Sequence, residues 1–473
     1  MESSFRSPWL AAAAGLILCG LCASSTAADP RETQASGSLS LEVVPDTRKT
    51  ATYQRIKAHL DSIPAIDTHD HLEFDTVPGL YTLWRESYFG VHVPPIGHKY
   101  QHIPVKQWWP LTEKAFADGR NTCFYKYQHI AFQDLYGVDF DQLTEAQAER
   151  LDAAVRARYQ DPAWIAEIVT KRANVEVVVI DYDYTPYDYV SPHPFGVSVV
   201  RLNPLVRGFH PDEYDNEPES PWHYAKVHGL PLKSLDDYLA VLDHIMRRAA
   251  DRGAVGMKST LAYTRTLRFE QVSREDAAKV FGRRRSELRA EQIRAFEDFV
   301  FWQFCTLSTR YDLPLQIHTG LAFDRSNPVH LENLIQAHPE TRFMVFHGGF
   351  PWIGETSMLA MRFSKNVWID SNWLPTVSYS VAKRAFHEWL DIIPSNRILW
   401  GSDTLHAEGL YGATAMTRRC LAEVLAERVD RSDMTEAEAR IVGRKILREN
   451  ALEAFPRLRS RVASDAAAAL PGE

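Results

Sequence analysis

The residues of this 473-residue chain that are best suited to chemistry begin with a pair of histidines, His69 and His71. They close a short apolar run that is typical of a buried strand. Alternate residues of a strand point to one side, so the two imidazoles project together while Asp70 turns away. Imidazoles about 7 Å apart along a strand can converge on one divalent ion, which neutral imidazole commonly binds. An isolated H-x-H pair is weak evidence, so a metal site depends on other residues.

Three further polar residues, His318, His347 and Asp403, each end another apolar, strand-like run. Taken singly, each is more simply explained as a polar residue satisfied by hydrogen bonds in a loop. In a barrel of parallel strands, however, the carboxyl ends of all strands face one mouth. Together with the histidine pair, these residues therefore predict one constellation at that mouth.

Lys258 ends a fourth such run and has three interpretations, which the sequence leaves open. It could be a carbamylated ligand that bridges two metals, a cation that binds a substrate carboxylate, or a structural residue in a salt bridge. Tyr263 and Arg265 follow it closely, and a guanidinium offers a two-pronged fork to a carboxylate. We therefore count Lys258, Tyr263 and Arg265 as candidate substrate-binding residues.

The elements that must position these residues are eight short apolar runs alternating with helical patterns. This alternation is typical of a parallel sheet wrapped by helices, and eight strands fit a (β/α)8 TIM barrel better than an open doubly wound sheet. No G-x-G-x-x-G follows the first run. The candidate strands cover residues 64–72, 175–182, 196–202, 253–259, 313–318, 342–347, 366–370 and 397–403.

About a hundred residues separate the first two strands, too many for an ordinary βα loop. We expect a mainly helical insertion at about 73–170, with a helix at 144–159. On the catalytic face it would form a lid or pocket wall, although most of its aromatic residues are better explained as its own small core. The aromatic and histidine residues that prompt this expectation are Trp84, Tyr88, Phe89, His92, His98, Trp108, Trp109, Tyr125, Tyr127 and His129.

Composition narrows the class of protein. A 45% hydrophobic and 24% charged chain is ordinary for a globular protein. The net charge of −8 leaves no basic surplus for nucleic acid. Of five cysteines, Cys123, Cys305 and Cys420 lie far apart without C-x-x-C spacing, so no disulfide scaffold is expected. We divide the chain into a polar linker at 29–50, a barrel at 51–455 with a further helix at 284–310, and a flexible tail at 456–473.

The first 28 residues have the order of an export signal, with Arg6, then an apolar run at 9–22, then small residues up to Ala28. The run is too short to span a membrane comfortably, so we expect a periplasmic or secreted protein without a membrane span. A lipid anchor at Cys22 is the alternative, and Leu21 before it fits that signal poorly.

This set of residues resembles the amidohydrolase superfamily over residues 60–455. The phrases Gln316-Ile317-His318-Thr319-Gly320, Phe346-His347-Gly348-Gly349 and Trp400-Gly401-Ser402-Asp403 are most similar to its amidohydrolase-2 branch. The insertion is similar to those of uronate isomerases and of the amidohydrolase domain fused to glutamine synthetase-like proteins. The resemblance implies His69, His71 and Asp403 as metal ligands and His318 as a further ligand. It implies that His347 orients or polarises the substrate.

The resemblance and the residues together predict a divalent metal, zinc with manganese as the alternative, at one or two ions per chain. Such an ion lowers the pKa of its water to about 7, so a metal-bound hydroxide could hydrolyse an amide, a lactone or a related bond in a small anionic substrate. Asp403 would move the proton and His347 would stabilise the oxyanion. Alternatives are a non-oxidative decarboxylase, a uronate-isomerase-like enzyme and a non-catalytic binding protein. A homo-oligomer is compatible with the sequence.

Overall fold

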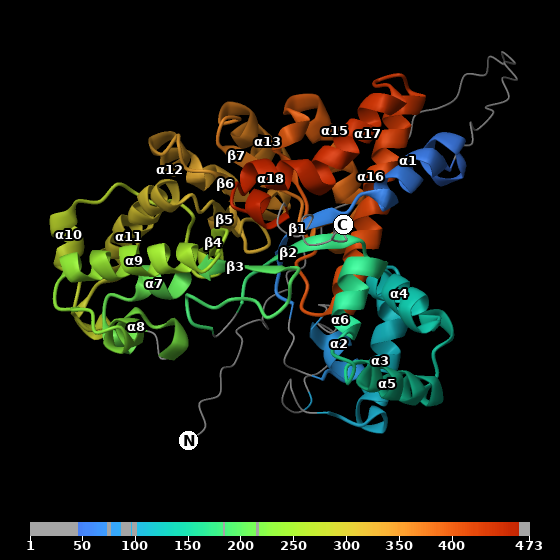
Figure 1. Ribbon diagram of the computed structural model, residues 1–473, viewed down its shortest axis with the longest axis horizontal. Coiled ribbons are helices and arrows are strands. Elements are labelled where there is room, and N and C mark those ends of the chain that lie inside the picture. The colour runs from blue at the N-terminus through green and yellow to red at the C-terminus, as the bar shows by residue number, and fades with distance from the viewer. Residues whose placement is uncertain are drawn as a thin grey trace, which may run out of the picture. The chain divides into compact units, whose positions relative to one another are not determined.

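The protein is a barrel of eight parallel strands, seen in a computed structural model that describes residues 46–72, 77–86, 96, 102–182, 185–213 and 217–462 (Figure 1). Each strand pairs with the next along the chain, in the order β1 to β8, which confirms the predicted fold and all eight predicted strands. The strands are β1 Ala65–Asp70, β2 Val175–Ile180, β3 Gly196–Arg201, β4 Gly256–Ser259, β5 Leu315–Ile317, β6 Phe343–Val345, β7 Val367–Asp370 and β8 Ile398–Leu399.

Backbone hydrogen bonds join β8 to β1 and so bring the first and last strands together. The amide of Thr68 donates to the carbonyl of Trp400 at 3.2 Å. The amide of Asp403 donates to the carbonyl of His69 at 2.9 Å, and that of His71 to the carbonyl of Thr404 at 2.9 Å. These bonds fix Asp403, in the segment that follows β8, beside the end of β1.

The period-2 alternation of the strands divides their side chains between two apolar cores. In β2, Val177 and Val179 face a cluster inside the barrel, while Val178 and Ile180 belong to the large core between strands and helices. Phe455, just after the last helix, joins the inner cluster. Apolar side chains therefore fill the barrel axis below the strand ends that carry polar residues.

The helices begin where their capping residues predict. Ser234 and Asp237 form a capping box at the start of α9, and Thr144 and Gln147 form one at the start of α5. The helices are α1 Ala51–Ser62, α2 Leu80–Glu86, α3 Val105–Gly119, α4 Cys123–Tyr136, α5 Glu145–Arg158, α6 Trp164–Ala166, α7 Asn203–Arg207, α8 Pro221–Val227, α9 Leu235–Asp251, α10 Arg274–Ala278, α11 Ala290–Tyr311, α12 Glu332–Ala337, α13 Ile353–Arg362, α14 Leu374–Val377, α15 Tyr379–Ile392, α16 Ala407–Asp430, α17 Glu436–Arg444 and α18 Asn450–Ala454.

The structure differs from the sequence expectations at the start of one helix and within the linker. The helix expected at 284–310 begins only at Ala290, because a separate 3-10 turn at Arg285–Glu287 precedes it and Gln292 caps the new start. The expected linker at 29–50 includes the ordered turn Thr47–Lys49, which Asp46 caps. Residues 1–45 and 463–473, which include the expected export signal and most of the tail, lie outside the described residues.

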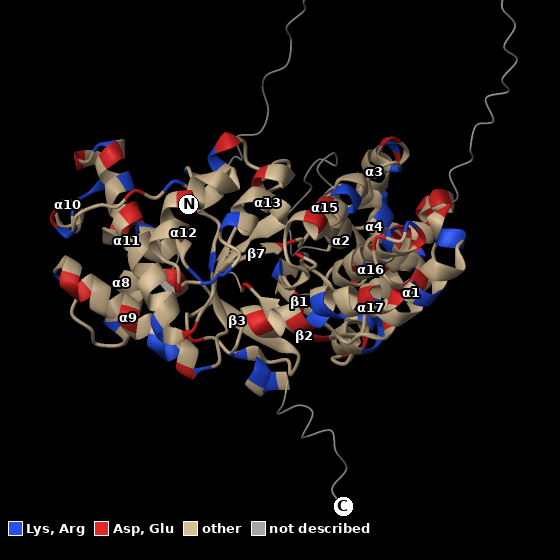
Figure 2. Cartoon of the chain, turned by 90° about the horizontal axis from the view of Figure 1, so that it is seen from above, with Lys and Arg blue, Asp and Glu red and all other residues tan. Residues whose placement is uncertain are grey.

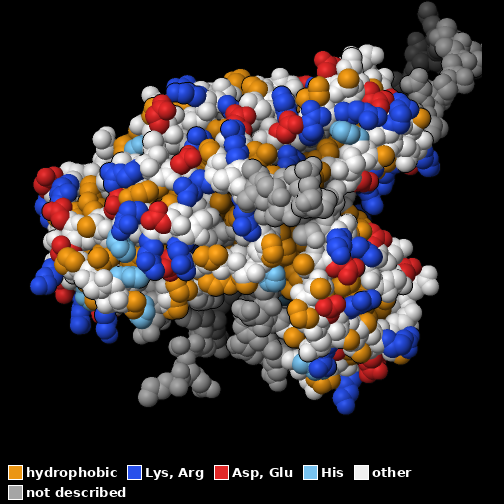
Figure 3. Space-filling model, viewed as in Figure 1, with side chains coloured by type: hydrophobic (Ala, Val, Ile, Leu, Met, Phe, Trp, Pro, Cys, Tyr) orange, Lys and Arg blue, Asp and Glu red, His pale blue; other side chains and the backbone are white. Residues whose placement is uncertain are grey.

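The insertion between β1 and β2 forms a lobe beside the barrel (Figures 1 and 3). Its helices α2 to α5 enclose a separate aromatic core, in which Trp84 packs edge-on against Trp108 and Phe116. This confirms that most of its aromatic residues form their own core. Tyr88, Phe89, His92 and His98 lie outside the described residues.

Helix α4 holds this lobe against the barrel. A Cβ atom added to Gly412 of α16 would lie 2.2 Å from the carbonyl oxygen of Tyr127, so glycine permits a close approach of α4 and α16. The buried carboxylate of Glu408 accepts hydrogen bonds from Tyr136 at 2.6 Å and from Tyr159 at 2.7 Å. Since Glu408 lies five residues after Asp403, the lobe is tied to the element that follows β8.

The charged residues lie mostly on the outer helices, with both signs intermixed (Figure 2). Within the described part of the chain, no helix is long and apolar enough to cross a membrane. Cys123, Cys305 and Cys420 are free thiols, as expected.

Candidate metal centre

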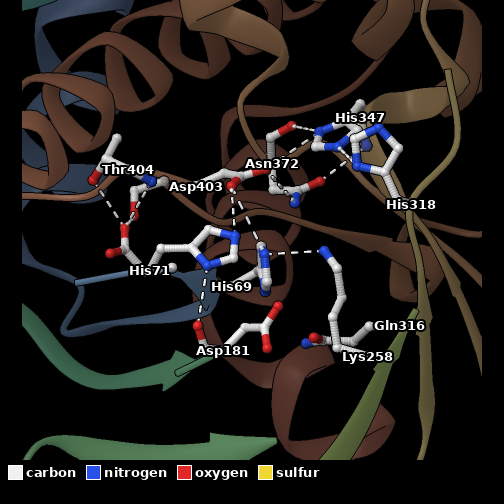
Figure 4. A network of polar contacts seen from close by, with 12 residues as sticks. His69, His71, Asp181, Lys258, Gln316, His318, His347, Asn372, Asp403 and Thr404 are labelled. Carbon is white, nitrogen blue, oxygen red and sulfur yellow. Dashed lines mark hydrogen bonds and ion pairs between the residues drawn. The ribbon is translucent and has the colours of Figure 1, made fainter. Parts of the chain in front are cut away.

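Three predicted residues meet at the mouth of the barrel, where β1 and β8 end (Figure 4). His69, His71 and Asp403 each offer one ligand atom, and these atoms lie within 4.8 Å of one another. The Nε2 atoms of both histidines are 3.7 Å from Oδ1 of Asp403. Burial lowers the pKa of both imidazoles, which favours the neutral form that binds metal.

A hydrogen bond orients His71 for this role. Its Nδ1 lies 3.0 Å from the backbone carbonyl of Asp181, and a carbonyl only accepts, so Nδ1 carries the proton and the Nε2 lone pair faces Asp403. The Asp181 carboxylate is fully buried and binds Arg201 through two hydrogen bonds of 3.1 and 2.7 Å. Burial alone would raise the pKa of Asp181, but Arg201, His71 and Lys258 together outweigh it and the pKa lies below its ordinary value.

Beneath the histidines, two buried carboxyl groups join β1 to β8. The Ser402 hydroxyl lies in hydrogen-bond contact with the carboxyl groups of both Asp67 and Asp70, and Asp70 also accepts from the amide and hydroxyl of Thr404 at 3.0 and 2.9 Å. Burial raises the pKa of Asp67, and it raises that of Asp70 to about 7. Asp70 thus turns away from the site, as predicted, and helps to set the spacing between His71 and Asp403.

His318 and His347 form a second pair of imidazoles on the other side of Asp403 (Figure 4). His347 Nδ1 faces the carbonyl of Asn372 at 3.2 Å and must carry a proton, so its Nε2 accepts from Nδ1 of His318 at 3.0 Å. The remaining lone pair is on Nε2 of His318, a buried atom with no hydrogen-bond partner among the described residues. His318 can therefore offer a ligand atom, although it lies outside the three-residue group.

This arrangement narrows what His347 can do. Burial, more than the nearby charges, lowers its pKa to about 4, so the ring is neutral near pH 7. Both ring nitrogens are engaged, by Asn372 and by His318. The one ring proton, on Nδ1, is already donated to Asn372, so the predicted donation to a substrate oxyanion would require that bond to break or Nε2 to gain a proton, and it stays a prediction.

Lys258 is buried at the centre of the site. Its Nζ lies 3.0 Å from Nε2 of His69 and 3.8 Å from the ring centre of Phe346. Burial lowers the pKa of Lys258 to about 8, while the carboxylates of Asp403 and Asp181 oppose that shift. Because the lysine and a metal would use the same lone pair of His69, metal binding would displace this hydrogen bond.

The two remaining candidates have different surroundings. Tyr263 lies at the centre, with its ring 4.2 Å from that of His318. Arg265 is buried instead in an ion-pair network with Glu297 and Asp298, and it also stacks on Phe269 at 4.6 Å. The guanidinium group of Arg265, expected to bind a substrate carboxylate, is thus already paired with two acidic residues of α11. The position of Arg265 in the sequence gives no sign of this contact with a distant helix.

Three residues around the centre have left-handed backbone, which side chains other than glycine rarely adopt. They are His347 with φ 58°, Trp373 with φ 60° and Asp403 with φ 53°. Such conformations cost about 1–3 kcal/mol each and cluster at functional sites. The surroundings therefore hold His347 and Asp403 in fixed positions.

Sequence reasoning missed Asp181, Arg201 and Asn372. It also missed Asp370, which accepts hydrogen bonds from the Thr68 hydroxyl at 2.6 Å and from the backbone amide of Asn372 at 2.9 Å. Each ends a strand or follows one within two residues, and that position is the signal that could have identified them. A second group, His129, Asp139 and Asp141, has the spacing of a metal site in the insertion. There Asp139 caps a turn, and Asp141 accepts a hydrogen bond from Tyr125 at 2.7 Å.

Part of the chain is similar in sequence to known proteins. Residues 235–457 match the family described as Amidohydrolase. Over 220 residues, or 42% of the chain, it is 30% identical to Protein fluG of Emericella nidulans, of which it spans 25%.

Two solved structures have the same fold at low sequence identity. Uronate isomerase from Thermotoga maritima is 15% identical, with a TM-score of 0.68 over 85% of this chain and 97% of that one. A provisionally assigned metal-dependent hydrolase from Lactobacillus casei is 17% identical, with a TM-score of 0.60 over 85% and 98%.

Proposed function

We propose, from the premise that this chain belongs to the amidohydrolase superfamily, that it hydrolyses an amide, lactone or related C–N or C–O bond of a small anionic molecule. The observation that carries the proposal is the meeting of two oriented imidazoles and one carboxylate at the barrel mouth. The family match supports an enzyme of amidohydrolase type that uses a divalent metal.

The residues present fit such an ion. His69 and His71 direct neutral Nε2 atoms toward Oδ1 of Asp403, and His318 has a buried Nε2 without a hydrogen-bond partner among the described residues. Two or three nitrogens and a carboxylate oxygen form the donor set expected for zinc. When bound, the ion would polarise the substrate and acidify a water molecule.

The two oxygens of Asp403 are suited to different tasks. Oδ1 faces the two imidazoles, whereas Oδ2 lies 3.4 Å from Nδ2 of Asn372 and 3.6 Å from Nδ1 of His347. We propose that Oδ2 takes the proton from the attacking water and delivers it to the leaving group. Asn372 and the left-handed backbone hold the carboxylate in place for both transfers.

Lys258 supplies the positive charge of the site. The side-chain amine of Lys258 is mostly protonated at neutral pH, since its pKa is about 8. The charged group lies over the ring of Phe346. With a metal held by His69, the ammonium of Lys258 would lose its hydrogen bond to that histidine and would be available to bind a substrate carboxylate. We therefore propose the second of its three predicted roles, binding of a substrate carboxylate, which is consistent with an anionic substrate.

Sugar-acid isomerisation is the alternative, because two of the similar folds belong to uronate and glucuronate isomerases. Decarboxylation at the same centre is a further alternative. An export signal at residues 1–28 would favour hydrolysis of incoming compounds in the periplasm or outside the cell, and we propose this location on the sequence alone. Mass spectrometry of the mature N-terminus tests it, and an uncleaved Met1 would contradict it.

The function is tested by screening zinc-loaded protein on N-acyl amino acids, lactones, aromatic acids and glucuronate. We expect 18O from labelled water in the product acid. Release of CO2 without 18O incorporation would contradict hydrolysis. Asp403→Asn should lower turnover by at least about a hundredfold while the chain still folds, because Asp403 would serve as both ligand and base.

A further inference from the structure

Aromatic side chains border the His318 and His347 end of the centre. Tyr263, in the loop after β4, packs its ring 4.2 Å from that of His318 and remains 45% exposed. Trp373, in the loop after β7, lies with its ring 5.6 Å from that of His347. Phe124 of the insertion in turn lies 5.8 Å from Trp373. The polar pair is thus flanked by aromatic rings from two loops, and Phe124 of the insertion packs behind one of them.

The loop after β5 adds a further aromatic residue, Phe323, which is 69% exposed. Its φ is 56°, and Leu321 and Gly320 nearby have φ values of 61° and 71°. Hydrogen bonds from Leu321 to the carbonyl of Phe350 at 2.9 Å and from Gly320 to that of Ser326 at 2.8 Å stabilise this turn. A strained but well-bonded loop therefore keeps a large apolar side chain in contact with solvent.

Tyr263 and Phe323 belong to one connected rim, because the loops that carry them are hydrogen-bonded. Arg325 donates from Nε to the carbonyl of Ala262 at 3.1 Å, and its own carbonyl accepts from the amide of Leu267 at 2.9 Å. The rim lies beside the strand ends β4 and β5, which carry Lys258 and His318. The ring of Tyr263 therefore lies against His318 at the metal centre, and Phe323 belongs to the loop bonded to it.

We infer that the substrate carries an aromatic or other bulky apolar group, which Tyr263 and Phe323 bind, in addition to a carboxylate. The inference rests on the proposed function, because it names the substrate class of the same site. A polyhydroxylated sugar acid would need hydrogen-bonding partners where the rim instead offers ring faces. Tyr263 and Phe323 are then specificity-determining residues, and Trp373 positions His347.

Binding tests this inference without turnover. Calorimetry on zinc-loaded protein would compare 3-phenylpropionate, propionate and glucuronate. We expect 3-phenylpropionate to bind roughly tenfold more tightly than propionate, as a buried apolar group warrants. Tyr263→Ala/Phe323→Ala should abolish most of that ratio while changing propionate binding less than about twofold.

Met358→Ala is the matched control, since Met358 is 64% exposed on the outer helix α13, and it should leave the ratio unchanged. If the double variant does not fold, Phe323→Ser alone provides the test, because its side chain is largely in solvent. An unchanged ratio in the rim variants, or tighter binding of glucuronate than of 3-phenylpropionate, would overturn the inference. If the wild-type protein hydrolyses none of the screened substrates but still prefers 3-phenylpropionate to propionate, the proposed function is refuted and the aromatic rim is not.

Discussion

Replacing Arg201 with methionine should damage both folding and metal binding. The Asp181 carboxylate is fully buried, and Arg201 provides its two ionic hydrogen bonds. Removing one partner of a buried ion pair leaves an uncompensated charge and costs about 3–5 kcal/mol. The backbone carbonyl of Asp181 also orients His71, so we expect zinc affinity to fall about tenfold, as for other residues that support metal ligands.

Urea unfolding of the metal-free protein, followed by tryptophan fluorescence, measures the first effect, and competitive zinc titration measures the second. Arg448→Met is the matched control. It removes an ion pair with Glu176 of β2, the strand that Asp181 follows. The side chains of this pair are 26% and 25% exposed, so the free energy of unfolding should fall by at most about 1 kcal/mol. If Arg201→Met unfolds like this control, the reasoning about Asp181 is refuted.

The pH dependence of stability in the same variant tests whether Arg201 stabilises the ionised form of Asp181. Asp181 has a lowered pKa in the folded protein, so its contribution to stability is present above its ordinary value of 3.8 and is lost as pH falls. The stability difference between wild type and Arg201→Met should therefore be full at pH 7 and shrink in acid. A difference that grows as pH falls would contradict the assignment.

Further substitutions separate structural from catalytic roles. Arg265→Met should destabilise the fold by about 3–5 kcal/mol through Glu297 and Asp298, with KM of the folded enzyme unchanged; a large rise in KM at normal stability would restore its predicted substrate role. Lys258→Met should raise KM and leave the metal count per chain unchanged, whereas a fall from two ions to one by elemental analysis would indicate a carbamylated bridge. Glu408→Gln should remove a pH dependence of stability, because burial raises the pKa of Glu408. The favourable contribution of Glu408 is present below its ordinary pKa of 4.5 and is lost as pH rises through the pKa of the folded state. An unchanged dependence of stability on pH, measured by urea titrations, would refute this.

The sequence predicted the barrel well because its strands are buried on both faces and therefore appear as continuous apolar runs. Residues at the ends of those runs, such as His69 and Asp403, were identifiable because the fold gathers strand ends at one mouth. Contacts between side chains of distant elements could not be identified from the sequence. The engagement of Arg265 by α11 and the tautomer chain from Asn372 to His318 depend on side-chain directions that spacing alone does not specify.

The metal content of purified protein tests the central claim most directly. Elemental analysis, normalised to folded chain, should give at least one zinc or manganese ion per wild-type chain and close to none for His69→Ala/His71→Ala with an unchanged circular dichroism spectrum. His129→Ala, which alters the other group with ligand spacing, should keep the wild-type metal content. Full metal content in the double variant, or its loss in His129→Ala alone, would contradict a metal centre formed by His69, His71 and Asp403.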